Sequence, residues 1–338
     1  MATKPPKPRM PKTGRELAES VFEAHLEQLS RHVERNGIRG LRKLYAEARD
    51  ELQRRLRRAG PLSKSVEATT LRAMIAQVDA VLGKLGASVR KHLESVSHTA
   101  VEMGARHGVD EFRVLSKVFT GTTPVIGVDV GATFRGLVKG IDRSLLRRYR
   151  LQSQTWALRA IDQMERQLSV ATMTGKPLET VIDDVMGLKG FEGERWQAER
   201  IVRTESHYAH QAAKHRAVEL TAKELDEPLW KRLIETFDDR TGDDSFLLHG
   251  QTVPANKPFR WKHKKQGRWI VTDFMHPPNR PNDRAVMIPW DPSWKAERGE
   301  KPLTRAQLRA ARPTRWRKTP GVEVPPKHDP YPYGRPKV

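Results

Sequence analysis

Two groups of side chains have the residue types that metal chemistry would need. The first is a set of histidines, His207, His210 and His215, in the stretch HYAHQAAKH, which has the pattern of a helix. Zinc-binding histidines on a helix stand four residues apart. Gln211 and Lys214 occupy the positions four residues after the first two histidines. The spacing therefore favours surface or core histidines over a zinc site.

The second group is the acidic run in DDRTGDDS, which contains Asp238, Asp239, Asp243 and Asp244. Hard divalent cations prefer several carboxylate oxygens, but this spacing does not match a calcium-binding EF-hand loop. Capping of a short following helix and ion pairing with Arg240 explain the same residues without a metal. We therefore expect no metal ion and no cofactor.

Other catalytic patterns have little support. The segment IGVDVGATF, residues 126–134, contains the Asp, Gly and Thr of the phosphate-binding turn in sugar and acetate kinases. That turn needs a strand on each side, whereas the following FRGLVKGIDRSLLRRYR predicts a basic helix. The sequence lacks the GxSxG nucleophile elbow and the GxxxxGK[ST] phosphate loop, and no Ser-His-Asp arrangement can be assembled from its spacing. We expect a protein that is not an enzyme.

Composition excludes further classes of protein. The 338 residues contain no cysteine, which excludes disulfides, thiol catalysis, iron–sulfur clusters and cysteine-ligated zinc. Lysine and arginine number 62 against 41 acidic residues, and the net charge of +21 favours a polyanionic partner, with nucleic acid first. No run approaches the roughly 18 apolar residues of a membrane span, and the N-terminus lacks the apolar stretch of a secretory signal. We expect a soluble protein made in the cytoplasm, with no membrane partner.

Both ends of the chain are basic and rich in proline. Residues 1–15 hold five basic residues and no acid, and residues 295–338 hold twelve basic residues against four acids. Such segments bury too little apolar surface to offset their ordering entropy, so we expect disordered arms. They either keep the protein soluble or contact DNA or an acidic protein surface. The residues expected to contact nucleic acid are Lys4, Lys7, Arg9, Arg309, Arg312, Arg315, Arg317 and Lys318.

Apolar residues at helical spacing predict a helical N-terminal half. The first helix covers about 21–33 and ends at Asn36-Gly37, and the second covers about 41–56 and ends at Gly60-Pro61. A third helix of about 30 residues runs from Leu71 to Met103. After a break at residues 121–124, further helices are predicted over 134–168, after Pro177 and over 193–224.

The character of the sequence changes after Pro228. Strands are predicted over 229–237 and 285–290, and FRW with RWIVTDF reads as a hairpin around KHKKQG. The fold class is therefore α+β, with a predominantly helical N-terminal half and a small core with a few antiparallel strands. The expected domains are a basic arm at 1–15, a helical region at 16–174, an α+β core at 175–294 and a basic tail at 295–338.

An ordered set of short motifs runs through the expected core. It comprises Arg203-Thr204-Glu205 on a helix, a strand that Trp230 leads, Asp238 with Arg240-Thr241, the turn Leu248-His249-Gly250, and a strand after the Pro-rich stretch 281–289. In order and spacing this set, over about residues 175–290, resembles the minor head protein (head morphogenesis) family of tailed bacteriophages, the Mu F-like family. We infer that ordinary packing and ion pairs hold this set together, and the first pair to consider is Glu205 with Arg240 or Arg203.

The resemblance implies a low-copy structural protein at the portal inside the phage head, which assists head assembly, DNA packaging or DNA ejection. Its implied partners are the portal protein and the major capsid protein, together with packaged double-stranded DNA. It would lie in the virion, and in the host cytoplasm during assembly. The alternative, on the charge alone, is a free basic DNA-binding or DNA-processing protein.

Two features separate this chain from some members of that family. Relatives carry cysteine pairs where this sequence has Gly242, Ser245, Asp283 and Ala285, so a zinc role is not carried over. Some relatives also have a C-terminal toxin or enzyme domain. The roughly 45 residues after the core are too few to form such a domain.

Overall fold

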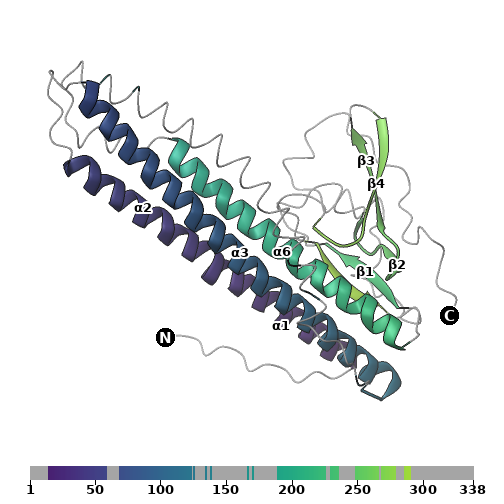
Figure 1. Ribbon diagram of the computed structural model, residues 1–338. Coiled ribbons are helices and arrows are strands. Elements are labelled where there is room, and N and C mark those ends of the chain that lie inside the picture. The colour runs from purple at the N-terminus through teal and green to yellow at the C-terminus, as the bar shows by residue number, and fades with distance from the viewer. Residues whose placement is uncertain are drawn as a thin grey trace, which may run out of the picture. The chain divides into compact units, whose positions relative to one another are not determined.

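The computed structural model has the α+β fold that the sequence predicts (Figure 1). It describes residues 14–58, 68–123, 189–225, 229–235, 248–265, 268–278 and 285–290, with the single positions 125, 134, 138, 166 and 170. The helical elements are α1 (Gly14–His32), the π-helix η1 (Val33–Ile38), α2 (Arg39–Arg58), α3 (Ala68–Thr120) and α6 (Lys189–Leu225). The strands are β1 (Trp230–Ile234), β2 (Thr252–Pro254), β3 (Phe259–Lys265), β4 (Arg268–Phe274) and β5 (Val286–Trp290).

The expected helix end at Asn36-Gly37 is wrong, because α1 continues through η1 into α2 without a break. Gly37 serves close packing instead of helix termination. A Cβ at this position would lie 2.6 Å from Cγ1 of Val202 on α6 and 3.4 Å from Cγ1 of Val96 on α3. The widened π turn also leaves the Gly37 carbonyl oxygen to accept a hydrogen bond of 2.8 Å from Nε2 of His92.

The third predicted helix is correct in position but too short. α3 has 53 residues, and its apolar seam continues beyond Met103 through the buried Val109, Phe112 and Leu115. Buried polar residues interrupt this part of the seam, so the helical spacing of apolar residues cannot be recognised there from the sequence. The helix ends at Thr120, directly before the predicted break at 121–124.

Three predicted strand regions are confirmed. β1 and β5 pair antiparallel, with Trp230 opposite Trp290, and β2 lies on the other side of β1 to complete a three-stranded sheet. β3 and β4 form the predicted hairpin, and β3 continues beyond FRW through KHKK. The short strand β2 was not predicted. The buried core beneath these strands consists of Leu233, Leu248, Val253, Phe259, Ala285 and Met287.

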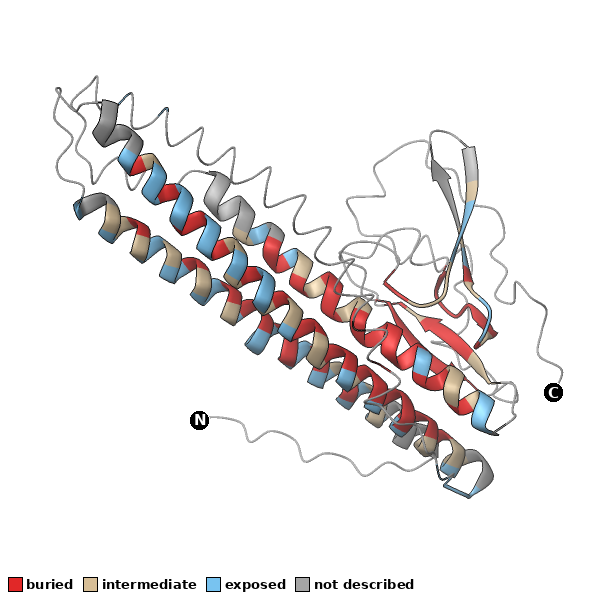
Figure 2. Ribbon diagram, in the orientation of Figure 1, coloured by how far each residue is buried: buried red, intermediate tan, exposed pale blue. Residues whose placement is uncertain are grey.

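The described residues group into two compact units. The first takes its residues from 14–29, 101–135 and 207–290, which include all five strands, and the second from 30–100 and 136–206. In the first unit, residues 209–215 of α6 are all buried (Figure 2). Among the described helices, none is long and apolar enough to cross a membrane. The predicted short helix after Pro177, residues 1–13 and the tail lie outside the described residues, as does nearly all of 134–168.

Candidate functional site

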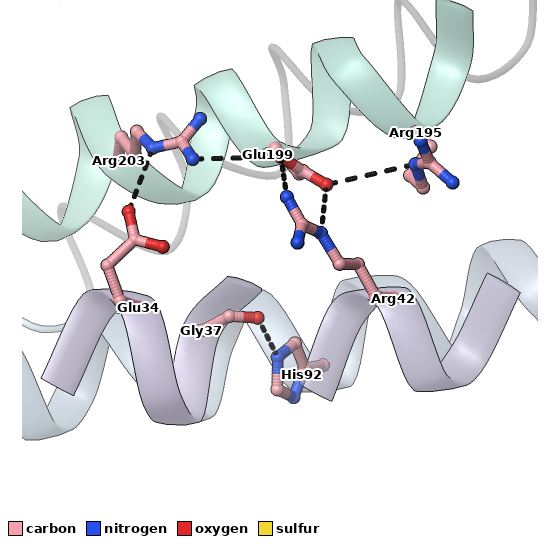
Figure 3. Close-up of polar contacts among 7 residues, drawn as sticks. All are labelled: Glu34, Gly37, Arg42, His92, Arg195, Glu199 and Arg203. Carbon is pink, nitrogen blue, oxygen red and sulfur yellow. Dashed lines mark hydrogen bonds and ion pairs between the residues drawn. The ribbon is translucent and has the colours of Figure 1, made fainter. Parts of the chain in front are cut away.

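The first motif of the expected set, Arg203-Thr204-Glu205, lies on α6 in the second unit. The Arg203 guanidinium pairs with Glu34 of η1 at 3.3 Å and with Glu199 of its own helix at 3.7 Å (Figure 3). Thr204 and Glu205 are both buried. The motif therefore contributes one solvent-facing cation and two enclosed side chains to the packing of α6. The expected pairing of Glu205 with Arg240 lies outside the described residues.

Glu199 is the centre of this ion-pair network. Its carboxylate accepts two hydrogen bonds from the Arg42 guanidinium of α2, at 2.8 and 3.2 Å, and lies 3.8 Å from Nε of Arg195 (Figure 3). The hydrogen bond and the charge of Glu199 raise the pKa of Arg42 above its ordinary value. A two-point guanidinium–carboxylate contact fixes direction as well as distance. The network therefore sets the register of α6 against α2 and η1.

The turn motif, Leu248-His249-Gly250, is fastened to β1, the strand that Trp230 begins. The amide of Gly250 donates to the carbonyl of Leu233 at 2.8 Å, with Gly250 at a φ of 77° that favours glycine. The amide of Glu235 donates to Nδ1 of the buried His249 at 3.2 Å. The structure thus places His249 and Gly250 beside the C-terminal end of β1, whereas Trp230 lies at its N-terminal end, opposite Pro254 and Trp290. The other residues of the set, Asp238, Arg240 and Thr241, lie outside the described residues, as do all the basic residues expected to contact DNA.

The three histidines of α6 bond to other protein groups. Nε2 of His207 donates to the carbonyl of Ala285 at 2.7 Å, and Nε2 of His215 lies 2.9 Å from the carbonyl of Ala255. The interpretation as core histidines is confirmed for His210 and His215, which are buried, while His207 is half-buried. Within the part of the chain that the structure describes, no group of three or more His, Cys, Asp or Glu residues is arranged to hold a metal ion.

A chain of hydrogen bonds crosses the interior of the first unit from β5 to α1. The amide of Met287 donates to Oε1 of Gln211 at 3.0 Å, which leaves Nε2 of Gln211 to donate to Nδ1 of His210 at 3.4 Å. Nε2 of His210 lies 2.8 Å from Nδ1 of His107, and Nε2 of His107 lies 3.1 Å from Oε1 of Gln28. Since an amide oxygen only accepts, His107 must carry its hydrogen on Nε2, and His210 then donates to it. Every hydrogen bond in the chain runs in one direction.

This chain of bonds requires neutral imidazoles, and burial provides them. Desolvation, with the charges of His25 and Lys214, lowers the pKa of His107 to about 3. Desolvation also lowers the pKa of His210 well below its ordinary value. A protonated His107 would have no lone pair on Nδ1 to accept the bond from His210. The hydrogen-bond geometry and the lowered pKa values therefore both favour neutral imidazoles at neutral pH.

A buried ion pair lies beside the hydrogen-bonded chain. Lys214 of α6 contacts the carboxylate of Glu111 on α3, and the other carboxylate oxygen lies 3.1 Å from Nδ1 of His25 on α1. The rings of His25 and His107 stack with their centroids 3.8 Å apart. Glu111 and Lys214 are 1% and 3% exposed, so the cost of burying either charge is offset by its contact with the other. The cluster ties three helices together at one point.

A second buried lysine, Lys231, joins β1 to α6. Its Nζ donates to the carbonyl of Met275 at 2.7 Å and lies 2.9 Å from Nε2 of His215. Burial lowers the pKa of Lys231 to about 7 and that of His215 to about 3. Nε2 of His215 can donate to Ala255 or accept from Lys231, but one nitrogen cannot do both with a single hydrogen. Protonation of the lysine and the tautomer of the histidine are therefore coupled.

Sequence reasoning missed the residues that build these clusters: His25, Gln28, His107, Glu111, Lys214 and Lys231. It also missed His276, whose ring centroid lies 5.9 Å from that of His215 and whose pKa is lowered to about 4 by burial. A signal was present in the spacing. His107 and Glu111 are four residues apart on the otherwise apolar seam of α3, and His210 and Lys214 are four apart on α6. Polar pairs at that spacing lie on one helix face and can share a partner. The partners themselves come from helices about 80 to 100 residues away, which spacing does not reveal.

Comparison of the chain with family models, curated proteins and solved structures gives no match. Apart from Gln28, which is exposed, the polar side chains of the histidine chain, of the Glu111–Lys214 pair and of the Lys231–His215 contact are buried and bonded to one another. Such groups hold helices and strands in one packing and suit a structural role.

Proposed function

We propose that this chain is a minor head protein of a tailed bacteriophage, a low-copy structural component at the portal inside the head. In this role it assists head assembly and DNA packaging or ejection. The observation that carries the proposal is the ordered motif set of residues 175–290, from Arg203-Thr204-Glu205 through Trp230 and Leu248-His249-Gly250 to the closing strand. Each of these described pieces occupies the type of element that the set requires.

The polar interior of the first unit supports a structural role. A hydrogen-bonded chain, the Glu111–Lys214 pair and the Lys231 contacts fix the packing of α6 against its neighbours. Buried polar groups that satisfy one another favour a single arrangement of the elements over alternatives. A protein that occupies a fixed position in an assembled phage head needs a single arrangement of its helices and strands.

The proposed partners are the portal protein and the major capsid protein, with packaged double-stranded DNA as a further contact. The charge of +21 suits a protein that lies close to packaged DNA, because lysine and arginine neutralise phosphates. The proposed location is the head interior near the portal, with the host cytoplasm as the site of assembly.

A conditional null phage tests the proposal. Loss of the chain should leave portal and capsid proteins at normal levels but reduce the yield of DNA-filled heads, and the wild-type gene supplied in trans should restore that yield. A free DNA-processing protein would instead change DNA synthesis or concatemer cutting before heads fill. Normal titre and normal DNA-filled heads in the null phage would contradict the proposal.

A further inference from the structure

Two stripes of surface residues run along neighbouring helices of the second unit. The first stripe follows η1 and α2 at steps of four, three, four and three residues, a spacing that keeps its members on one helix face. Its members, all of them exposed, are Arg35, Arg39, Arg42, Ala46 and Arg49. The stripe spans about 21 Å at 1.5 Å per residue, and none of its members is acidic.

The second stripe lies on α6 and contains Trp196, Arg200 and Arg203, again at steps of four and three residues. Trp196 is 68% exposed. Tryptophan usually buries most of its large apolar surface, so an indole in this position suits a contact with something outside the chain. Arg200 is exposed and stands one helical turn from the indole.

Two contacts place the stripes beside each other. Arg42 of the first stripe donates to Glu199 of α6 at 2.8 Å, and Arg203 of the second stripe pairs with Glu34 of η1 at 3.3 Å (Figure 3). Both stripes therefore border the same helix–helix contact. We call the surface that the two stripes form the arginine face.

The arginine face has more cations than its neighbouring carboxylates can balance. Its six arginines stand against Glu34 and Glu199, which leaves a net charge of +4. Both carboxylates are already paired with arginines, and the Glu199 side chain is only 6% exposed. Among the described residues, no ion pair or hydrogen bond engages the guanidinium groups of Arg35, Arg39 and Arg200.

We propose that the arginine face binds single-stranded nucleic acid, with its arginines on the phosphates and a base stacked on Trp196. A guanidinium matches a phosphate through two parallel N–H bonds. Proteins that bind single strands combine a basic surface with exposed aromatic side chains on which the bases stack. The inference goes beyond the proposed function and does not require the chain to be a head protein.

The composition of the arginine face favours this ligand over two others. A stable protein–protein interface has an apolar centre, whereas the apolar residues of this face are Trp196 and Ala46 alone. Interfaces with nucleic acid are more polar and much more positively charged. The bases of a duplex are already stacked on one another, so a duplex would leave the exposed indole without a partner.

The first test measures the stacking contact on the full-length chain, by fluorescence anisotropy of a labelled strand of about 12 thymidines. Trp196→Ala should weaken binding about fivefold or more, whereas Trp196→Phe, which keeps an aromatic ring, should retain most of the affinity. On a strand of the same length that lacks bases, Trp196→Ala should bind as the wild type does. Wild-type affinity of Trp196→Ala for the thymidine strand, or an equal loss on both strands, would overturn the proposal.

The second test measures the phosphate contacts by titrating salt against the same strand. Arg39→Gln with Arg200→Gln removes two exposed cations and leaves the ion pairs of Arg42 and Arg203 in place. The control, Arg90→Gln with Lys91→Gln, removes the same charge from exposed positions of α3 outside both stripes.

Each contact to a single strand contributes about 0.7 to the slope of log K against log salt, so the arginine variant should lower the slope by about 1.4. The control should lower it less. Equal decreases in the two variants would overturn the proposal. An equal loss of binding to poly-L-glutamate would also overturn it, because the arginine face would then bind any polyanion.

A third measurement needs no variant and so does not depend on how a variant folds. An iodouracil-substituted strand bound to the wild type is cross-linked to nearby aromatic side chains by ultraviolet light, and the cross-linked peptides are identified by mass spectrometry. The chain has eight tryptophans, and the cross-link should map to the peptide that contains Trp196. Cross-links confined to other peptides would overturn the proposal and would leave the head-protein proposal, which the null phage tests, untouched.

Discussion

Removing the negative charge of Glu111 should destabilise the first unit more than almost any other single polar change. Glu111→Gln keeps the shape of the side chain but leaves the Lys214 ammonium, 3% exposed, without its counter-charge. Breaking a buried ion pair by neutralising one partner costs about 3–5 kcal/mol. The hydrogen bond to Nδ1 of His25, 3.1 Å in the wild type, is also weakened.

Thermal unfolding followed by circular dichroism measures this loss. For a unit of 150–250 residues, 1 kcal/mol shifts the Tm by about 2–4 °C, so the expected drop is roughly 6–20 °C. The matched control is Glu47→Gln, which removes a carboxylate that is 60% exposed and lies 3.8 Å from Lys43. The control should leave the Tm within error of the wild type, because exposed ion pairs contribute little.

The double variant Glu111→Leu with Lys214→Met separates the two causes. If the cost comes from an uncompensated buried charge, replacement of both partners by apolar residues should restore most of the lost stability. His25 keeps its stacking on His107 but loses its hydrogen bond to residue 111, so recovery need not be complete. A Glu111→Gln variant with the Tm of the wild type would refute the claim that the buried ion pair stabilises this unit. A double variant with a Tm as low as that of Glu111→Gln would refute the claim that the loss comes from an uncompensated buried charge.

Two further predictions concern the same interior, and a third concerns helix packing in the second unit. Because burial lowers the pKa of His107 and His215 to about 3 and that of His276 to about 4, the unfolded chain binds more protons below about pH 6.5. The contribution of these histidines to stability should be complete above pH 6.5 and fall towards pH 4, and urea titrations should show a shallower fall in His276→Gln; an equal fall in both proteins contradicts this. Since the pKa of Lys231 is lowered to about 7, the wild type should gain stability relative to Lys231→Met between pH 7 and 10, and a pH-independent difference would count against a buried, neutral lysine. Gly37→Ala should lower the free energy of unfolding by about 1–3 kcal/mol, because the added Cβ would meet Val202. The control Gly83→Ala, with open space around the added Cβ, should leave stability unchanged or raise it by up to about 1 kcal/mol. Equal melting temperatures of the two variants would contradict the close packing at Gly37.

Much of the fold could be predicted because the periodic signals are local. The helices over 41–56 and 193–224, and the strands at β1, β3, β4 and β5, follow from apolar spacing and turn residues. The π-helical continuation at Asn36-Gly37 could not be predicted. Position 37 needs a glycine because Val96 and Val202, which are far away in the sequence, pack close to it. The strand β2 escaped because three residues are too few to show alternation.

The candidate site was harder to predict than the fold. Motif residues Arg203, Trp230 and His249 each make defined contacts in the structure, but the sequence did not identify the partners in those contacts. Arg203 pairs with Glu34, which is 169 residues away, and Glu111 pairs with His25 and Lys214 on two other helices. Such pairs depend on how helices are packed, a property that the spacing within one helix does not contain.

The most direct test of the head-protein proposal is quantitative mass spectrometry of virions purified by density gradient, with isotope-labelled peptides from this chain, the portal protein and the major capsid protein. The account predicts that peptides of this chain are present at a copy number close to that of the portal and far below that of the capsid protein. The peptides should persist after nuclease treatment and high-salt washing of intact particles. Virions that contain portal and capsid peptides but none from this chain would contradict the account.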